Sequence, residues 1–215
     1  MSKPHRQSVS RQSVKPRPGD GVPIDVIVDQ FVATDGTSVA NLGINAAELE
    51  VPDRRYTADM CAVSANHGTV RLIFAQERVD DSGWRSLVVV NMSNEAARRF
   101  LSTLRQMGGP SLDEIAIASE LRAEPLATKM SEPDPGQAIS LSANMVFTAV
   151  SGNEACLDFY QASPFAMMAV FASKQLALEP IVRVDLRTSL LLGLIDGLKS
   201  HGIVAQELKT RGGPA

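Results

Sequence analysis

Hydrophobic and polar residues alternate along two stretches of this chain in the same way. Ala58–Gln76 and Ala143–Gln161 each predict a strand, a tight turn with a central glycine, and a returning strand. The two stretches align without a gap, and Ala, Met, Leu, Phe and Gln recur at the same places. A shared hairpin is moderate evidence of duplication, since chance easily explains one match of alternating apolar residues.

Each hairpin is followed by a further strand and an amphipathic helix. Arg85–Met92 predicts the first of these strands, and Ser93 or Asn94 then caps a helix that runs to about Met107. A strand around Ile181–Leu186 precedes the second helix, expected over Thr188–Ser200. The two apolar stripes have the same i, i+3, i+4, i+7 spacing: Ala97, Phe100, Leu101 and Leu104 in the first helix, and Leu191, Leu194, Ile195 and Leu198 in the second.

We therefore expect an α+β fold in which two β-β-β-α repeats form antiparallel sheets, with helices on one face and an approximate twofold axis between the repeats. Ile24–Val32 and Ser38–Ile44 predict an N-terminal strand pair that extends one sheet. The expected organisation is a disordered basic tail over residues 1–22, repeat one with the N-terminal strands over 23–109, a helix (Ser111–Arg122) and a linker (Glu132–Gln137) within 110–138, and repeat two over 139–215.

The second repeat carries the pattern Ala143-Asn144-Met145 and, later, Leu157-Asp158-Phe159. With the strand and helix that follow, this pattern resembles a small uncharacterised bacterial domain family with a SecB-like, export-chaperone-like fold, here present as two tandem copies. The first repeat matches more loosely, with Asp59 in place of Asn144. The resemblance implies self-association and polypeptide binding instead of catalysis, and it assigns no functional residue.

Composition narrows the classes of function. The formal net charge of −3 argues against a general electrostatic grip on nucleic acid, which leaves only the basic tail as a weaker candidate for such contact. The N-terminus lacks the apolar segment of a secretory signal, and no run is long enough to cross a membrane, so a cytoplasmic protein is expected. Cys61 and Cys156 occupy different places in the two repeats and are interpreted as reduced thiols.

No catalytic, cofactor-binding or metal-binding residue is predicted. None of the three histidines, His5, His67 and His201, has a neighbour at metal-ligand spacing, and no phosphate-binding glycine motif occurs. Glu154 and Asp158 share one face of a strand and are interpreted as solvent-facing, although an acid–base pair is the alternative. Asp59 and Asn144 are expected to bind local backbone groups. Paired contacts about a twofold axis are the alternative for those two residues.

The repeats differ most in one insertion. Ala162–Glu179 stands where repeat one has a short charged loop, and it contains an uncharged run with two methionines and two phenylalanines. One interpretation is a partner-binding or oligomerisation surface, since flexible methionine suits varied apolar partners. The other is core that covers the rest of the chain. The candidate partner-binding residues are Phe165, Met167, Met168, Val170 and Phe171.

The sequence thus favours a non-enzymatic polypeptide-binding or adaptor protein of chaperone-like type, acting as a homo-oligomer without a cofactor. The alternative is an enzyme or small-ligand-binding protein with a site in the cleft between the two repeats.

Overall fold

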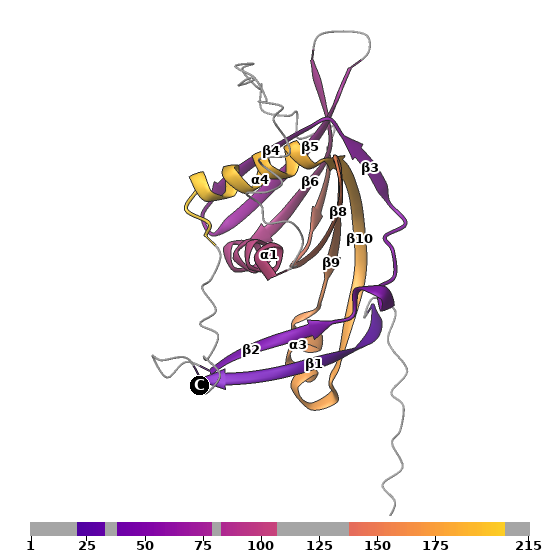
Figure 1. Cartoon of the computed structure of the whole chain (residues 1–215), viewed down its shortest axis with the longest axis vertical. Helices are drawn as coiled ribbons and strands as arrows, with labels where there is room; N and C mark the ends of the chain where they lie inside the picture. The colour runs from indigo at the N-terminus through magenta and orange to yellow at the C-terminus, as the bar shows by residue number, and fades with distance from the viewer. Residues whose placement is uncertain (1–20, 33–37, 79–82, 107–137, 205–215) are drawn as a thin grey trace, which may run out of the picture.

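The structure, a computed structural model, describes residues 21–32, 38–78, 83–106 and 138–204 of the 215-residue chain. It is a mixed α+β fold built mostly of curled, mainly antiparallel sheets, with three α-helices in the described part (Figure 1). The expected helix Ser111–Arg122, the linker Glu132–Gln137 and the basic tail up to residue 20 lie outside the described residues.

Two sheets form the body of the molecule. The larger has the order β2-β1-β10-β9-β8, with β3 pairing to β10, and the smaller has the order β4-β5-β6-β7. The strands are β1 Val22–Val32, β2 Ser38–Ile44, β3 Arg55–Ala58, β4 Met60–Asn66, β5 Thr69–Glu77, β6 Trp84–Ser93, β7 Ile139–Ser142, β8 Met145–Ser151, β9 Glu154–Gln161 and β10 Gln175–Arg187. The helices are the 3-10 turn η1 Ala46–Glu48, α1 Asn94–Gln106, α3 Pro164–Ser173 and α4 Thr188–Ser200.

The expected hairpins, third strands and amphipathic helices are all present. Ser93 caps α1 by accepting a hydrogen bond from the Ala96 amide at 3.1 Å. The strand pair β1–β2 extends the larger sheet, as predicted, because Val22–Asp25 pair with Leu178–Gln175 of β10. The third strand of the second stretch was predicted too short, since β10 begins at Gln175 and not near Ile181.

The strand triplets β4-β5-β6 and β8-β9-β10 share one hydrogen-bonding register. Met60 pairs with Ala75 as Met145 pairs with Tyr160. Each triplet carries a bulge at one place, Leu87 in β6 and Ile181 in β10, where the register shifts between flanking pairs. The helices also begin alike, because the amide of the first helical residue donates to the carbonyl of a hairpin residue: Asn94 to Gly68, and Thr188 to Asn153.

Two short strands that the sequence analysis missed connect the sheets. The strand β3 pairs in parallel with β10, and β4, which follows it, belongs to the other sheet. In the same way β7 pairs in parallel with β6 before the chain enters β8. Four-residue strands without a clear alternation leave no periodic signal, and their pairing partners are far away in the sequence.

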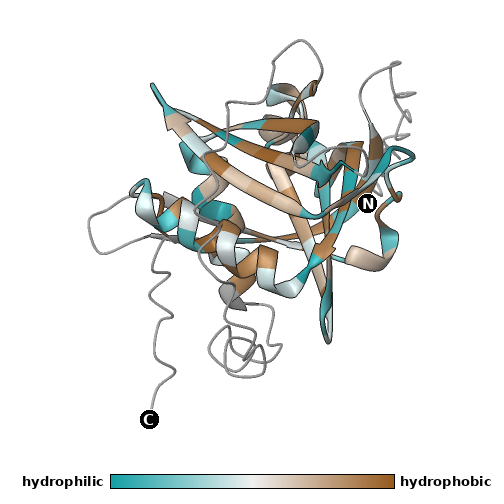
Figure 2. Cartoon of the chain, turned by 90° about the horizontal axis from the view of Figure 1, so that it is seen from above, coloured by the Kyte–Doolittle hydropathy of each residue, from teal (hydrophilic) through white to brown (hydrophobic). Residues whose placement is uncertain are grey.

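The main core lies between the inner faces of the two sheets and under α1 and α4. Phe74 and Phe159 meet edge to face with ring centroids 5.9 Å apart, one from each sheet. Figure 2 shows the hydrophobic and hydrophilic positions that alternate along the strands. A second apolar cluster joins the β1–β2 hairpin to α3 and the nearby ends of β9 and β10, and it includes Ile24, Val26, Tyr160, Val170 and Leu176.

The helices pack across the two sheets. The helix α4 contacts β4 of the smaller sheet most closely, whereas α1 contacts β8 of the larger one, so neither helix covers only the sheet that precedes it in the chain. Gly197 allows the close approach of α4, because a Cβ atom there would lie 2.9 Å from Cγ2 of Val63. At Gly193, one turn earlier, an added Cβ atom would have no neighbour within 4 Å.

This packing predicts opposite effects for two glycine substitutions in α4. Gly193→Ala should stabilise the protein by about 0.5–1 kcal/mol through helix propensity. Gly197→Ala should destabilise it by about 1–3 kcal/mol, since the new methyl group overlaps the stiff Val63 side chain. Urea unfolding measures both, and the double variant Gly197→Ala/Val63→Ala should recover most of the loss. Equal stability of the two single variants would contradict this packing.

Candidate functional site

The insertion forms helix α3 and the first residues of strand β10. Ser163 caps the helix by accepting a hydrogen bond from the Ala166 amide at 3.1 Å, and Pro164 occupies the first turn. Lys174 ends it in a left-handed conformation with φ of 57°. These signals fix a ten-residue helix without a charged side chain between its caps.

The five candidate partner-binding residues divide between two faces of α3. Val170 is fully buried, and Met167 is half-buried against the second apolar cluster. Phe165 and Met168 point to solvent, with 84% and 75% of their surface exposed, and Phe171 is 43% exposed. One face of the insertion is therefore core, and the other is an uncovered apolar surface in the described chain. We call Phe165, Met168 and Phe171 the α3 face.

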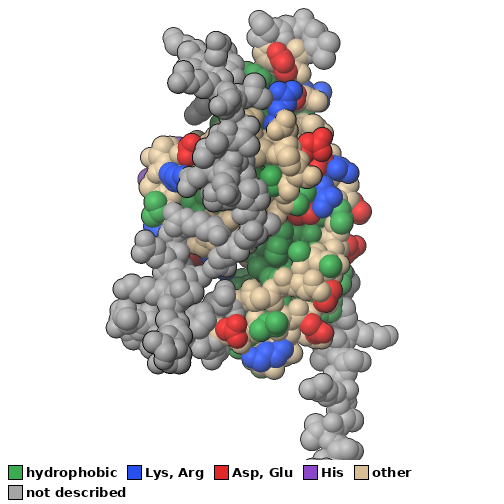
Figure 3. Space-filling view, in the orientation of Figure 1, with side chains coloured by type: hydrophobic (Ala, Val, Ile, Leu, Met, Phe, Trp, Pro, Cys, Tyr) green, Lys and Arg blue, Asp and Glu red, His purple; other side chains and the backbone are tan. Residues whose placement is uncertain are grey.

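A hollow lies near α3. Figure 3 shows hydrophobic side chains gathered in a recess above the β1–β2 hairpin, where the lower ends of β8 and β9 lie in Figure 1. The second apolar cluster has half-buried members on these same elements, and they are Val28, Leu42, Ile44, Met145 and Phe147. Half-buried apolar side chains around a recess are typical of a surface that accepts apolar groups.

Asp59 and Asn144 bind local backbone, as expected. The Asp59 carboxylate accepts a hydrogen bond from the Glu77 amide at 3.3 Å. Asn144 accepts one from the Ala162 amide at 2.9 Å and donates one to its carbonyl at 2.8 Å. Each side chain thus holds the end of the strand that returns beside it, which is a structural role.

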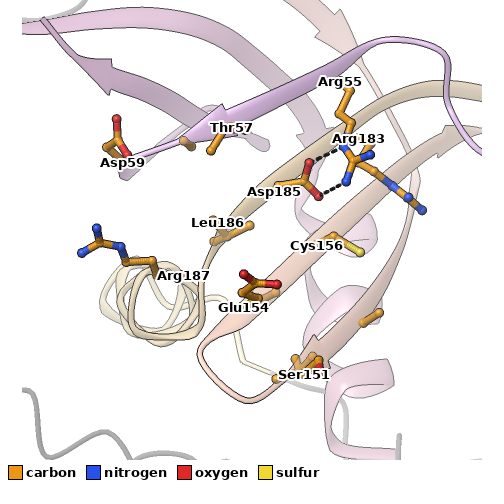
Figure 4. A pocket seen from close by; sticks show the side chains of 14 residues that line it. Arg55, Thr57, Asp59, Ser151, Glu154, Cys156, Arg183, Asp185, Leu186 and Arg187 are labelled. Carbon is orange, nitrogen blue, oxygen red and sulfur yellow. Dashed lines mark hydrogen bonds and ion pairs between the residues drawn. The ribbon is translucent and has the colours of Figure 1, made fainter. Parts of the chain in front are cut away.

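The outer face of the larger sheet carries a charged pocket that sequence reasoning missed. It is bordered by β3 on one side and by β8, β9 and β10 on the other, with a volume of about 600 Å³ (Figure 4). The residues that matter chemically are Arg55, Glu154, Cys156, Arg183, Asp185 and Arg187. Arg183, Asp185 and Arg187 alternate along β10 and so share a face, and the sequence could have indicated this charged strand face. Arg55 comes from β3, a strand distant in the sequence.

Two bidentate ion pairs organise this face. The Arg183 guanidinium donates through Nε and Nη2 to Asp158, its partner across β9 and β10. Arg55 donates through Nε and Nη2 to Asp185. Hydrogen bonding to the carboxylates raises the pKa of both arginines above the ordinary value. The guanidinium groups therefore stay charged at any accessible pH.

Asp158 was predicted to face solvent, and this is wrong. The residue is only 9% exposed, whereas Glu154, two positions along the same face, is exposed. Alternation correctly placed both residues on the outer face, but the Arg183 side chain binds the Asp158 carboxylate, and Phe147 pairs with Asp158 across β8 and β9. An acid–base pair of Glu154 and Asp158 has no support, because the Asp158 carboxylate is held by Arg183.

The two cysteines differ in surroundings, and both are free thiols. Cys61 lies on the inner face of β4, where its Sγ donates a hydrogen bond to the Leu190 carbonyl oxygen at 3.2 Å. Burial raises the pKa of the Cys61 thiol to about 12. Cys156 lies on the outer face, on the floor of the charged pocket.

The described residues hold no group of three or more potential metal ligands, and none of their helices is long and apolar enough to span a membrane. Comparison of the chain with protein-family models, curated proteins and solved structures finds no match. The site is therefore interpreted from its own geometry.

The Asp158–Arg183 pair predicts a large loss of stability when one partner is removed. Arg183→Met leaves a carboxylate buried without its counter-ion, so the free energy of unfolding should fall by about 3 kcal/mol. Lys199→Met provides the control, because Lys199 forms an exposed pair with Asp196 and should change stability by less than about 0.5 kcal/mol. If chemical denaturation gave similar small losses of stability for Arg183→Met and Lys199→Met, the burial of the Asp158–Arg183 pair would be contradicted.

The buried Cys61 thiol predicts alkaline destabilisation. The thiol loses its proton near its ordinary pKa of 9.0 when unfolded but near 12 when folded, so stability falls as pH rises between these values. Burial likewise raises the pKa of Tyr160 to about 12, which adds to the trend. Relative to its own stability at about pH 8, Cys61→Ala should lose roughly 2–4 kcal/mol less by pH 12 than the parent protein. Cys156→Ala is the control, and an equal alkaline loss in all three proteins would argue against a buried thiol.

Proposed function

We propose that this protein is a non-enzymatic, cytoplasmic polypeptide-binding or adaptor protein of SecB-like, chaperone-like type that acts as a homo-oligomer. The observation that carries the proposal is the α3 face, which presents two phenylalanines and a methionine to solvent on a helix without charge. Burying such side chains against an unfolded polypeptide stabilises the complex by about 1.5–3 kcal/mol for each side chain that becomes fully buried.

The recess above the β1–β2 hairpin supports the same proposal. Its surroundings supply half-buried aliphatic and aromatic side chains, and α3 packs on the same apolar cluster. Exposed and half-buried apolar groups on adjoining elements suit extended segments of varied sequence, since dispersion and hydrophobic contacts impose little directional selectivity.

We also infer that the chain is a tandem duplication of a β-β-β-α unit with approximate twofold symmetry. The matched register, the matched bulges and the matched helix starts support this inference. The two short parallel strands add to it, because Asn91 pairs with Ser142 as Asp185 pairs with Thr57. On this view the α3 segment is an addition to one copy, as expected for a feature acquired for binding.

Two neighbouring methionines provide the test. Met168→Ser should leave stability within about 0.5 kcal/mol of the parent, because the side chain is exposed, yet should weaken the binding of a reduced, unfolded client about tenfold. Met167→Ser should lower stability by about 1–3 kcal/mol, because its side chain packs on the second apolar cluster.

Calorimetric unfolding gives the stability of each variant, and fluorescence anisotropy of a labelled unfolded client gives the affinity. Val51→Ser, which removes another exposed apolar side chain far from α3 in the sequence, is the matched control and should bind like the parent. Light scattering reports the oligomeric mass. A parent protein that ignores unfolded clients, or a Met168→Ser variant that binds them unchanged, would exclude this role for the α3 face.

A second candidate function is favoured by the charged pocket. If the duplication is correct, β3 belongs to the first copy and β8, β9 and β10 to the second, so the pocket is lined from both copies. That is the location expected for an enzyme or small-ligand-binding protein with a site between repeats.

A further inference from the structure

The outer part of the β1–β2 hairpin projects beyond the rest of the larger sheet. The strand β1 pairs with β10 only through Val22–Asp25, whereas its pairing with β2 runs without a break from Val26 with Ile44 to Val32 with Ser38. Figure 1 shows the hairpin extending away from β10 at the lower end of the molecule. Within the described residues, no further strand pairs with the outer edge of β2 or with β1 beyond Val26.

One backbone hydrogen bond shows which main-chain groups face these two edges. The Val26 amide donates to the Lys174 carbonyl oxygen at 2.9 Å, so it points away from β2. Main-chain groups alternate in direction along a strand. The amide of Gln30 therefore also points away from β2, and the amides of Ala40 and Leu42 point away from β1, toward the outer edge of β2.

The edge of β2 lacks the features that normally protect an exposed strand edge. Its sequence, Ser-Val-Ala-Asn-Leu-Gly-Ile, contains no charged residue and no proline, and no bulge interrupts its pairing with β1. Charged residues, proline and bulges are the usual means by which proteins prevent pairing between edges. The outer part of β1, by contrast, contains Asp29. The edge of β2 is therefore the one suited to accept another strand.

The sequence of β2 is complementary to itself in an antiparallel pair. A pair centred on Asn41 places these residues opposite each other in two copies: Ser38 and Ile44, Val39 and Gly43, and Ala40 and Leu42. Each pair combines a small residue with a larger aliphatic one, and no like charges lie opposite each other. In this register Ala40 and Leu42 form a hydrogen-bonded pair, since their main-chain groups face the shared edge.

A strand on this edge would also cover apolar surface. Leu42 and Ile44 are half-buried members of the second apolar cluster, and burying them further adds hydrophobic stabilisation to the main-chain hydrogen bonds. An unfolded client could form the same main-chain hydrogen bonds. The match of small with large residues, however, is a property of two β2 strands, and it favours a second copy of this chain.

We propose that two copies of this chain associate through β2, which pairs antiparallel with β2 of the second copy about a twofold axis at Asn41. The two hairpins then form one four-stranded sheet in the order β1-β2-β2-β1. Because both copies use the same edge, the contact closes a dimer. This interface rests on the homo-oligomer of the proposed function and is independent of client binding by the α3 face.

Matched proline substitutions in the full-length chain test the interface, with sedimentation velocity at several protein concentrations as the measurement. Ala40→Pro removes an amide that points to the outer edge of β2 and should raise the dissociation constant of the dimer at least about tenfold. Gln30→Pro is the control, because Gln30 lies opposite Ala40 and its amide points to the other edge, so the dimer should persist. Neither change removes a hydrogen bond between β1 and β2, and circular dichroism checks that both variants fold.

Cysteine crosslinking tests the register. In a Cys156→Ala background, Asn41→Cys places two thiols opposite each other at the axis, with Cα atoms about 4.5 Å apart, which a disulfide can span. Mild oxidation should therefore give a covalent dimer on a denaturing gel. Ala40→Cys is the control, because its thiol lies opposite Leu42 of the second copy and should crosslink at least about tenfold less.

The outcomes separate this interface from the proposed function. A parent protein that is monomeric at every concentration would overturn both the interface and the homo-oligomer. A dimer that survives Ala40→Pro, or that Asn41→Cys does not crosslink, would overturn the β2 interface alone. The client anisotropy assay is repeated on Ala40→Pro: a lower mass with unchanged client binding supports the interface, whereas lost client binding with unchanged mass would assign the edge to the client and overturn it.

Discussion

The structure depends on the burial of one face of each sheet against the other. Phe74 and Phe159, at the centre of the two inner faces, bring the sheets into contact, and the apolar stripes of α1 and α4 close the same core. Because side chains alternate along a strand, this requirement fixes the register of every paired strand and leaves the opposite positions for the outer faces. The charged pocket exists because the outward positions of β9 and β10 can carry charges without disturbing the core.

The parallel strands β3 and β7 make the two sheets interdependent. Each pairs with a strand of one sheet and then continues into an edge strand of the other. The helix α4 packs mainly on the smaller sheet, and α1 contacts both sheets. Neither triplet of strands has its own closed core. Loss of the β3–β10 or the β7–β6 pairing would expose apolar surface on both sheets, so we expect the described residues to unfold cooperatively.

The long strand β10 joins the two candidate surfaces. Its first residues pair with β1 next to α3, and its last residues carry Arg183, Asp185 and Arg187 in the pocket. Both surfaces arise where the two strand triplets differ. The α3 insertion is absent between β5 and β6. On the smaller sheet, Asn91 and Arg71 stand at the positions that Asp185 and Cys156 occupy in the pocket. Positions that the two strand triplets have in common build the core. The candidate functional surfaces lie at positions where the triplets differ.

Local periodicity determined much of this protein. It specified the hairpins, the third strands, the two amphipathic helices and the inward-facing residues such as Phe74 and Phe159, because alternation and helical spacing follow directly from backbone geometry. It also identified the Phe/Met insertion as the main difference between the two similar stretches. The tertiary structure decided what no local pattern encodes. It divided the insertion into a buried and an exposed face, buried Asp158 beneath Arg183, and brought Arg55 across to Asp185. Those outcomes depend on pairing between strands far apart in the chain, where the partner is set by the packing of the whole core and not by neighbouring residues.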